Sequence, residues 1–289
     1  MSRNDAKKTA LIMEGGAMRG LFTCGIMDVL MEENITFDGA AGISAGAVFG
    51  VNYKSKQHGR PLRYNTTFCK DPRYCSLKSL ITTGDLYGVD FCYREIPEHL
   101  DVFDAETFAK NPMEFYIGAT DVETGECVYH KCSDGGTEDN LWMRASASMP
   151  LVSRPVEING RCYLDGGIVD SIPYHYMKEQ GFDRCLVILT QPEDYRKQAN
   201  RLLPLMRIVL RRYPRLIEAM ETRHLRYNAQ VAEVREDEKA GLVYVLFPKE
   251  SLRIGKTEKD ASELRRVYEE GRKIAIEKLP EIKAFLNKE

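Results

Sequence analysis

Several sequence patterns that define broad classes of protein are missing from this 289-residue chain. None of its eight cysteines stands in a C-x-x-C pair, which argues against a structural zinc site. Lysine and arginine number 41 and aspartate and glutamate 43, so the formal net charge of −2 indicates no nucleic-acid partner. No apolar run is long enough to span a membrane, and the chain has no internal repeat.

An export signal is missing as well. The N-terminal stretch, residues 1–8, is polar and has none of the apolar core of a signal peptide. The cysteines lie singly, and several stand inside apolar runs, as buried free thiols do. Reduced thiols without an export signal predict a cytoplasmic protein.

Short apolar runs that end in glycine turns and lead into helical patterns are the main feature that is present. Thr9–Met13 and Gly39–Ile43 are two such runs, and a further buried strand is expected at residues 184–190. Residues 114–119 and 126–130 are expected to form a β-hairpin. Strands that alternate with helices in this way predict an α/β fold with a mainly parallel sheet.

The second turn carries a serine between glycines. Gly42, Ser44 and Gly46 have the G-x-S-x-G spacing of a nucleophile elbow, in which a strained backbone points the serine oxygen out of the turn. Side chains two positions before and after the serine would collide with the neighbouring strand and helix, so glycine is required there. The helix that begins behind Ser44 adds free N–H groups and a positive dipole end. Because the pattern also occurs by chance, the other turns decide its meaning.

A glycine-rich turn also follows the first strand. Gly15 and Gly16 precede Ala17 and Met18, between a strand and a helix N-terminus, and such a turn places several N–H groups around one point. It suits an anion, and a tight structural turn is an equal alternative. A nucleotide-phosphate loop would need G-x-G-x-x-G or a G-K-[ST] ending, and neither is present. Turns on neighbouring parallel strands meet at one edge of the sheet, so this turn would lie beside Ser44.

A third turn offers a carboxylate. Asp165, Gly166 and Gly167 follow a brief strand-like run. Taken alone, an Asp-Gly turn is usually structural. In the company of a serine elbow, Asp165 is a candidate general base, and its glycines would let the serine or a substrate come close.

Histidine is the usual partner of a catalytic serine, and the chain has five. None stands in a turn of small residues. A Ser-His-Asp triad that includes His175 or His224 is an open alternative. His175, however, follows Pro173 at an expected helix start, where a surface or capping role is favoured.

Two longer segments lie between and after these motifs. Residues 52–112 mix basic and aromatic side chains, and they are expected to be a solvated insertion or a lid-like rim whose basic residues meet acidic head groups. A basic amphipathic helix at 201–217 is expected to pack its apolar face on the domain, and contact with an anionic membrane is the alternative. Ser146 and Ser148 lie among small residues and are expected at close-packing positions. The other elements expected are a helix at 140–149, a strand at 242–247 and a helix at 260–286.

The three turns, in this order and spacing, resemble the motifs of the patatin-like phospholipase family. Residues 145–150, Ala-Ser-Ala-Ser-Met-Pro, also resemble a stretch that precedes the family's aspartate. The resemblance covers residues 9–190 and implies a three-layer α/β/α patatin-like fold with a lid-like insertion at about 52–112. Residues 191–289 are expected to be a mostly helical C-terminal extension, similar to that of bacterial members.

The resemblance implies a Ser–Asp dyad in place of a Ser-His-Asp triad. Ser44 would attack an ester carbonyl and Asp165 would take its proton, without a metal or cofactor. Backbone N–H groups of the loop from Gly15 to Met18 would bind the oxyanion. The family usually has glycine where this chain has Ala17, which takes a positive φ less easily. The remaining residues of the family motifs are Arg19, Gly20, Gly42, Gly46, Gly166 and Gly167.

The function that the resemblance implies is that of a lipid acyl hydrolase. Phospholipids, lysophospholipids, monoacylglycerols and acyl thioesters all fit such a dyad. Peripheral contact with the inner face of the membrane is compatible with a lipid substrate. An alternative from another class is a lipid- or acyl-binding module that has lost catalysis, which Ala17 alone favours.

Overall fold

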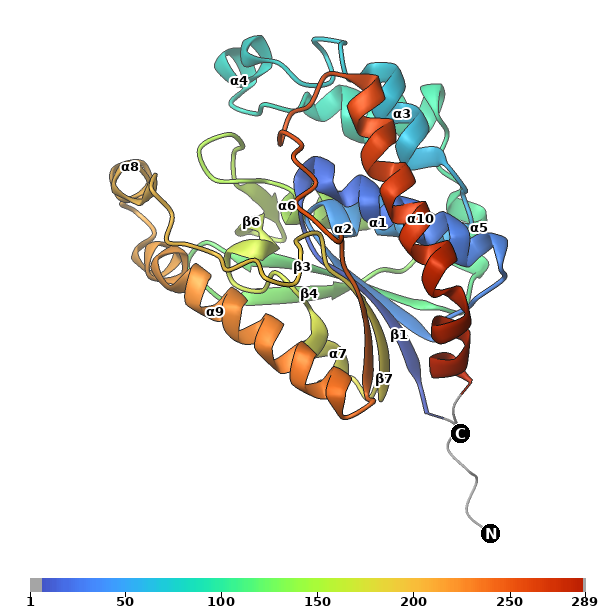
Figure 1. Ribbon diagram of the computed structural model, residues 1–289. Helices are drawn as coiled ribbons and strands as arrows, with labels where there is room; N and C mark the ends of the chain where they lie inside the picture. Colours follow the sequence, from blue (N-terminus) through green and yellow to red (C-terminus); the bar gives the residue numbers. More distant parts are fainter. Residues whose placement is uncertain (1–6, 288–289) are drawn as a thin grey trace.

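An eight-stranded sheet runs through residues 7–287, the part of the chain that the computed structural model describes (Figure 1). Residues 1–6 and 288–289 lie outside that range. Most of the N-terminal stretch on which the absence of an export signal was predicted therefore lies outside the described residues. Named so that neighbours are hydrogen-bonded, the strands are β5 (Val156–Ile158), β6 (Arg161–Asp165), β3 (Glu114–Asp121), β2 (Gly39–Ile43), β1 (Thr9–Met13), β7 (Arg184–Ile188) and β8 (Val243–Leu246). β4 (Cys127–Lys131) also pairs with β3. The strands from β3 to β8 in this order are parallel, whereas β4 and β6 are antiparallel to β3.

Helices cover both faces of the sheet. They are η1 (Ala17–Arg19), α1 (Gly20–Glu32), α2 (Ala45–Lys54), α3 (Arg60–Phe68), α4 (Leu77–Thr83), η2 (Phe91–Leu100), α5 (Ala105–Lys110), α6 (Thr137–Ser146), η3 (Gly166–Ile168), α7 (Tyr174–Glu179), α8 (Leu203–Val209), α9 (Pro214–Lys239) and α10 (Ala261–Leu286). Alternate residues of β1 point to opposite faces. Leu11 and Met13 pack in one core with α1, α2 and α10, whereas Ala10 and Ile12 pack with α7 and α9. The expected three-layer α/β/α fold is therefore confirmed.

Two strands lie end to end along one edge of β3. β2 runs parallel to residues 114–118 of β3, and β6 runs antiparallel to residues 119–121. β4 pairs with residues 116–120, which overlap both spans, so it occupies the opposite edge. Because β2 and β6 point toward each other, Ser44, which follows β2, and Asp165, which ends β6, come together at their junction.

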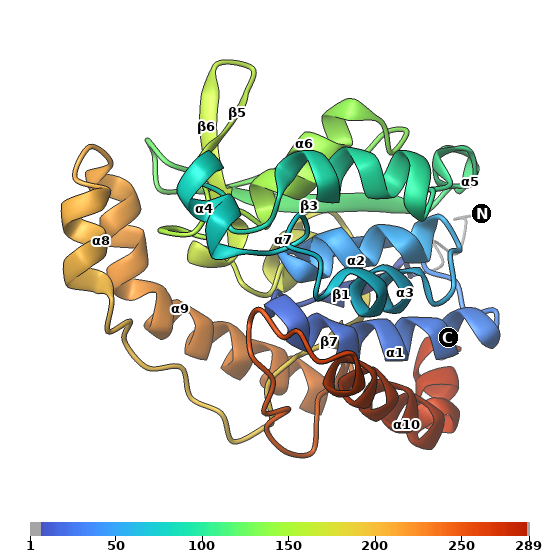
Figure 2. The same cartoon turned by 90° about the horizontal axis from the view of Figure 1, so that it is seen from above.

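The residues that follow β7 join the same sheet and core. β8 extends the sheet as a parallel strand beside β7, and α10 lies along α1 (Figure 2). A Cβ at Gly25 would lie 2.0 Å from the carbonyl oxygen of Tyr268, and a Cβ at Gly271 would lie 2.0 Å from that of Phe22. The two helices thus approach each other closely through glycine. The buried Asp28 accepts a hydrogen bond from the Tyr268 hydroxyl at 2.6 Å beside this crossing.

Most elements expected from the sequence are present, with corrected boundaries. The strand expected at 184–190 ends at Ile188, because Thr190 donates its N–H to the Glu14 carboxylate. The helix expected at 140–149 begins earlier, where the Asp139 carboxylate accepts N–H groups from the preceding turn. The helical region after residue 200 divides into α8 and α9, and α9 begins at Pro214.

Residues 52–112 form α3, α4, η2 and α5 on the side of the sheet that carries α1 and α2. Arg63 pairs with Asp101 at 2.9 Å, and Arg73 pairs with Asp71 at 2.8 Å. Arg60 is buried and donates two hydrogen bonds to the Asp101 carbonyl. These three arginines have protein partners, and contact of the segment's basic residues with acidic head groups stays a prediction.

The short helix α8 exposes most of its apolar side chains. The sequence analysis expected an apolar face packed on the domain, yet only Met206 and Leu210 are buried there. Ile208 and Val209 are 69% and 56% exposed. No helix in residues 7–287 is long and apolar enough to cross a membrane.

Candidate active site

Ser44 occupies a strained turn between β2 and α2. Its φ of 55° and ψ of −121° lie in a region that side chains rarely adopt. A Cβ at Gly42 would lie 2.2 Å from the carbonyl oxygen of Gly46, and a Cβ at Gly46 would lie 2.3 Å from that of Met13. A side chain at either glycine would push the strand and the helix apart. The two glycines therefore permit the turn that presents the Ser44 hydroxyl.

The glycine-rich loop after β1 lies against this turn. A Cβ at Gly15 would lie 2.9 Å from the Ser44 Cβ, and a Cβ at Gly16 would lie 2.7 Å from the Thr190 hydroxyl oxygen. Ala17 has a φ of 49°, so alanine here adopts a left-handed conformation that glycine reaches more easily. Ala17 and the following Met18 line the same pocket as Ser44.

Glu14 connects this loop to β7. Its buried carboxylate accepts the N–H of Thr190 at 2.6 Å and the hydroxyl of Thr190 at 3.1 Å. Arg19 donates from Nε to the same hydroxyl at 3.4 Å. Arg19 therefore lies at the carboxyl end of β7, near the candidate oxyanion loop.

Asp165 is buried where β6 meets β2. Its carboxylate accepts the N–H of Gly167 at 2.8 Å, and its carbonyl accepts the hydroxyl of Thr120 at 2.9 Å. Burial raises the pKa of Asp165, and a hydrogen bond with the Ser44 side chain and the charge of Arg223 offset this only in part. The Ser44 hydroxyl thus lies close enough to the carboxylate to influence its pKa, and the carboxylate binds a proton more tightly than an exposed aspartate does.

A pocket of about 360 Å³ opens beside Ser44. Residues of α2, among them Val48 and Phe49, form one side of it. The segment of residues 52–112 contributes much of the remaining wall. Its aromatic lining residues are Tyr64, Tyr74, Tyr87, Tyr93 and Phe103. A mostly apolar pocket of this size next to a serine suits a fatty acyl chain.

Comparison with known families agrees with this geometry. Residues 11–178, more than half of the chain, match the family described as patatin-like phospholipase. The chain belongs to the patatin-like phospholipase family. Residues 213–287 match a second family, described as a domain of unknown function (DUF6363).

Individual patatin-like relatives match the chain over a shorter span. The Escherichia coli protein YjjU is 27% identical over 198 residues, which cover 64% of this chain and 52% of YjjU. The lysophospholipase NTE1 of Phaeosphaeria nodorum is 28% identical over 195 residues, 63% of this chain and 12% of that protein. The chain therefore spans about half of the bacterial relative and a small part of the fungal one. The crystal structure of VipD from Legionella pneumophila aligns with a TM-score of 0.47 at 12% identity, over 96% of this chain and 67% of VipD.

Two buried serines of this patatin-like protein connect the turn of Ser44 to Asp165. Ser146 accepts the N–H of Ser44 at 2.8 Å and donates to the carbonyl of Gly118 at 2.6 Å. The carbonyl of Ser148 accepts the N–H of Asp165 at 2.8 Å. The sequence analysis expected both serines at close-packing positions and missed these hydrogen bonds. The run of small residues at 145–150 was the one signal that marked them.

The histidines of the alternative triad have other surroundings. The side chain of His175 is 65% exposed and lies 3.2 Å from Glu179 and 3.5 Å from Glu233. His224 has a buried Nδ1 without a hydrogen-bond partner in residues 7–287. Neither histidine lines the pocket beside Ser44. Apart from burial, the main influences on the pKa of Asp165 come from Ser44, Arg223, Gly167 and Lys256, and no histidine is among these.

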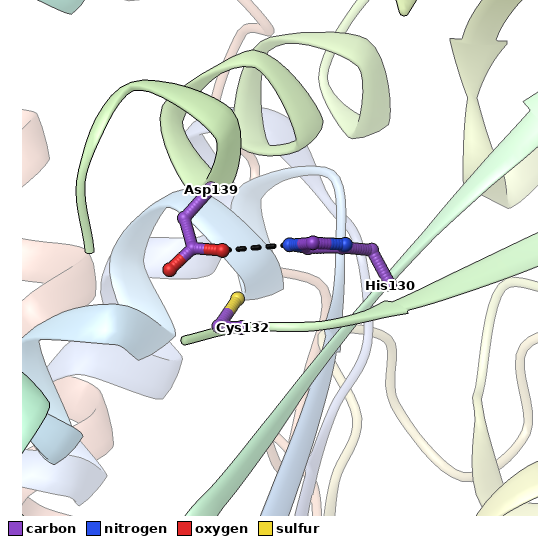
Figure 3. A group of neighbouring side chains, drawn as sticks. All are labelled: His130, Cys132 and Asp139. Atoms are coloured by element: carbon purple, nitrogen blue, oxygen red, sulfur yellow. Dashed lines mark hydrogen bonds and ion pairs between the residues drawn. The ribbon is translucent and has the colours of Figure 1, made fainter. Parts of the chain in front are cut away.

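A further polar group joins β4 to α6. His130 Nε2 lies 2.6 Å from Asp139 Oδ1, and the Cys132 thiol lies beside them (Figure 3). The other carboxylate oxygen of Asp139 accepts the backbone N–H groups of residues 133–135. Burial favours a raised pKa for Asp139, but the hydrogen bonds from His130 and these N–H groups outweigh it and lower the pKa. Because both carboxylate oxygens have donors and burial raises the pKa of the Cys132 thiol, we interpret the group as a structural link.

Proposed function

We propose that the protein is a serine hydrolase that cleaves carboxylic esters of phospholipids or related acyl lipids. One observation carries the proposal: Ser44 and Asp165 meet at the junction of β2 and β6, beside an apolar pocket. Membership of the patatin-like phospholipase family and the lysophospholipase names of the fungal relatives support the substrate class.

Acylation begins at the Ser44 hydroxyl. As Oγ bonds to the carbonyl carbon of the ester, its proton passes to the Asp165 carboxylate. The carbonyl oxygen becomes an oxyanion, which the backbone N–H groups of the loop from Gly15 to Met18 stabilise. Asp165 then gives the proton to the leaving alcohol as the C–O bond breaks, and Ser44 is left acylated.

Water completes the reaction. Asp165 takes a proton from the water as its oxygen attacks the acyl carbon, the ester bond to Ser44 breaks, and the proton returns to Oγ. The raised pKa of Asp165 suits this role, because a base accepts a proton better as its pKa approaches the working pH. In both steps the acyl chain occupies the pocket along α2, and residues 52–112 cover it as a lid-like insertion.

Peripheral contact with a membrane is the second part of the proposal. Four neighbouring apolar side chains are exposed at α8: Leu202, Leu205, Ile208 and Val209. The exposed Arg211 and Arg212 follow directly. An exposed apolar strip beside arginines suits the anionic inner face of a cell membrane. The protein would work from the cytoplasm and reach its lipid substrate at that surface.

A fluorophosphonate probe tests the nucleophile directly. We expect covalent labelling of wild type at Ser44, located by mass spectrometry, and no labelling of Ser44→Ala. The exposed Ser133 offers a matched control, since Ser133→Ala should be labelled as wild type is. A folded protein that is never labelled and releases no fatty acid from any ester would be an acyl-binding module instead.

A hydrolysis assay on a panel of acyl lipids tests the base. Asp165→Asn should lower kcat by about 10³-fold or more, since removal of a catalytic base leaves only the oxyanion contacts and binding. His175→Gln and His224→Gln should retain nearly full activity. Loss of activity in either histidine variant would favour the Ser-His-Asp triad.

A further inference from the structure

Four cationic side chains influence one another electrostatically near Asp165, and we call them the cationic cluster. Arg19 belongs to η1, Lys197 to the connection between β7 and α8, Arg223 to α9, and Lys256 to the loop between β8 and α10. None of the four lines the apolar pocket. Three of them lie in the C-terminal extension, outside the region that matches the patatin-like phospholipase family.

Arg223 and Lys256 are close to the candidate base. Arg223 donates from Nε to the carbonyl of Gly167 at 2.5 Å. A Cβ at Gly167 would lie 3.0 Å from Asp165 Oδ1 and 3.4 Å from an Nη atom of Arg223, so carboxylate and guanidinium flank the same glycine. The charges of Arg223 and Lys256 both act to lower the pKa of Asp165. The Lys256 carbonyl accepts a hydrogen bond from Tyr87, which lines the acyl pocket, at 3.1 Å.

Lys197 is fixed against α9. Its N–H donates to the Asn228 side chain at 2.9 Å, and its carbonyl accepts a hydrogen bond from the same side chain at 3.1 Å. The ammonium lies 4.0 Å from the centre of the Tyr227 ring. Burial lowers the pKa of Lys197 to about 8, and the charges of Arg223, Arg19 and Lys256 act in the same direction. The electrostatic influence of these three cations places Lys197 in the same group.

No ion pair in the described part of the chain balances the cationic cluster. Within residues 7–287 none of its four members forms one, whereas Arg207 pairs with Glu221 and Arg235 with Glu238. Glu14 is the acid that Lys197 faces, and its carboxylate already accepts two hydrogen bonds from Thr190. Uncompensated like charges repel one another, and a bound anion removes that repulsion. Guanidinium and ammonium groups together are the donors that a phosphate prefers.

We propose that the cationic cluster binds the phosphate of a lipid head group, so that the protein selects phosphate-bearing esters over neutral ones. The inference rests on the proposed hydrolase function of Ser44. The acyl chain would enter the pocket on one side of Ser44, and the phosphate would lie in the cluster beside Asp165. The scissile ester is then fixed at two points. Head-group selectivity, on this view, is the contribution of the C-terminal extension to the site.

Two lipids with the same acyl chain test the selectivity. The kcat/KM values for 1-acyl lysophosphatidic acid and 1-monoacylglycerol are measured in the same neutral detergent micelles. We expect wild type to prefer the phosphate lipid about tenfold or more, because hydrogen bonds to a charged group have that effect. Lys256→Gln should lower the ratio of the two values about tenfold. Lys259→Gln removes the same charge from the same loop and should leave the ratio unchanged.

The outcomes separate the two proposals. Equal kcat/KM values in wild type, or equal ratios in Lys256→Gln and Lys259→Gln, would overturn the phosphate site while the hydrolase function stands. No hydrolysis of either lipid and no fluorophosphonate labelling would overturn the hydrolase function itself.

Calorimetry on Ser44→Ala tests binding without turnover. We expect glycerol 3-phosphate to bind and glycerol not to bind, and Lys256→Gln in the same background should weaken the binding about tenfold. Absence of glycerol 3-phosphate binding would overturn the inference. Inorganic phosphate that binds as tightly, but does not inhibit hydrolysis of lysophosphatidic acid, would identify a free-phosphate site and overturn the assignment to a lipid head group.

Discussion

Replacing Ser146 by alanine tests how the strained turn at Ser44 is maintained. The Ser146 hydroxyl accepts the N–H of Ser44 at 2.8 Å and donates to the carbonyl of Gly118 at 2.6 Å. Its removal leaves a donor and a buried acceptor without partners, and each such loss costs about 1–3 kcal/mol. We therefore expect the free energy of unfolding to fall by about 2–4 kcal/mol in Ser146→Ala.

The same change should reduce activity more than substrate binding. The hydrogen bond to Ser146 helps to keep Ser44 at a φ of 55°, where its side chain influences the pKa of Asp165. Without it the turn can relax, and a misplaced nucleophile costs about tenfold or more in rate. We expect kcat for acyl-lipid hydrolysis to fall by that factor while KM changes little.

Ser148→Ala is the matched control. The Ser148 hydroxyl donates to the carbonyl of Arg144 at 2.8 Å, and its contact with Asp165 goes through the backbone, which alanine keeps. The loss of stability should therefore be about 1 kcal/mol or less. Urea unfolding followed by circular dichroism, together with hydrolysis rates, compares the two variants. Equal losses in both, or unchanged kcat in Ser146→Ala, would refute the reasoning.

Further predictions use other features of the structure. Gly271→Ala adds a methyl group 2.0 Å from a carbonyl of α1 and should lower the free energy of unfolding by about 1–3 kcal/mol. Gly255→Ala, with its nearest neighbour 3.8 Å away, should change it by less than about 0.5 kcal/mol, and equal unfolding energies would contradict the close crossing. Burial raises the pKa of Asp165, and protonation of this carboxylate removes the base. We therefore expect kcat/KM to fall on acidification at a pH above about 3.9, the ordinary pKa of an aspartate side chain. A carboxyl whose folded pKa is raised stabilises the fold at pH below its unfolded pKa, and this contribution is lost as pH rises through the folded pKa. At pH 7 the Asp165 charge therefore costs stability, and Asp165→Asn should raise Tm; a lower Tm would count against this reasoning. Above pH about 8, loss of the Lys197 proton should raise KM for lysophosphatidic acid but not for monoacylglycerol, and parallel profiles would contradict this. The charged and titratable groups that face Lys197 are Glu14, Arg19, Arg223, Tyr227 and Lys256. Ala17→Gly should keep activity and Tm, because glycine adopts the φ of 49° without strain; a large loss of hydrolysis would show that the alanine side chain is needed.

Steric requirements that belong to each type of turn made much of the fold and the candidate pair predictable from sequence. Glycine is needed at 42 because a Cβ there would meet the carbonyl of Gly46, and at 46 because a Cβ there would meet the carbonyl of Met13 on the neighbouring strand. Glycine is needed after Asp165 for a similar reason, since a Cβ at Gly166 would lie 2.3 Å from the carbonyl of Gly118 on the paired strand. Alternation of strands with helices likewise defines the parallel sheet without knowledge of distant contacts.

Features that depend on distant packing were not predictable. The role of Ser146 depends on how α6 docks against the end of β2, and nothing in its own sequence window specifies that contact. The four residues of the cationic cluster come from η1, the connection before α8, α9 and the loop before α10. In the sequence each of them looks like an ordinary surface charge. The periodicity of α8 shows an apolar face but does not tell whether the protein covers it, and in the structure most of that face is exposed.

The junction of β2 and β6 has a consequence for the chain during its synthesis. Ser44 leaves the ribosome more than a hundred residues before Asp165, and β6 can pair only once β3 is in place. A shorter nascent chain therefore carries the nucleophile without its base. On the proposed mechanism, esterase activity arises only after Asp165 has been made and folded beside Ser44, so incomplete products would not hydrolyse the lipids of the cell that makes them.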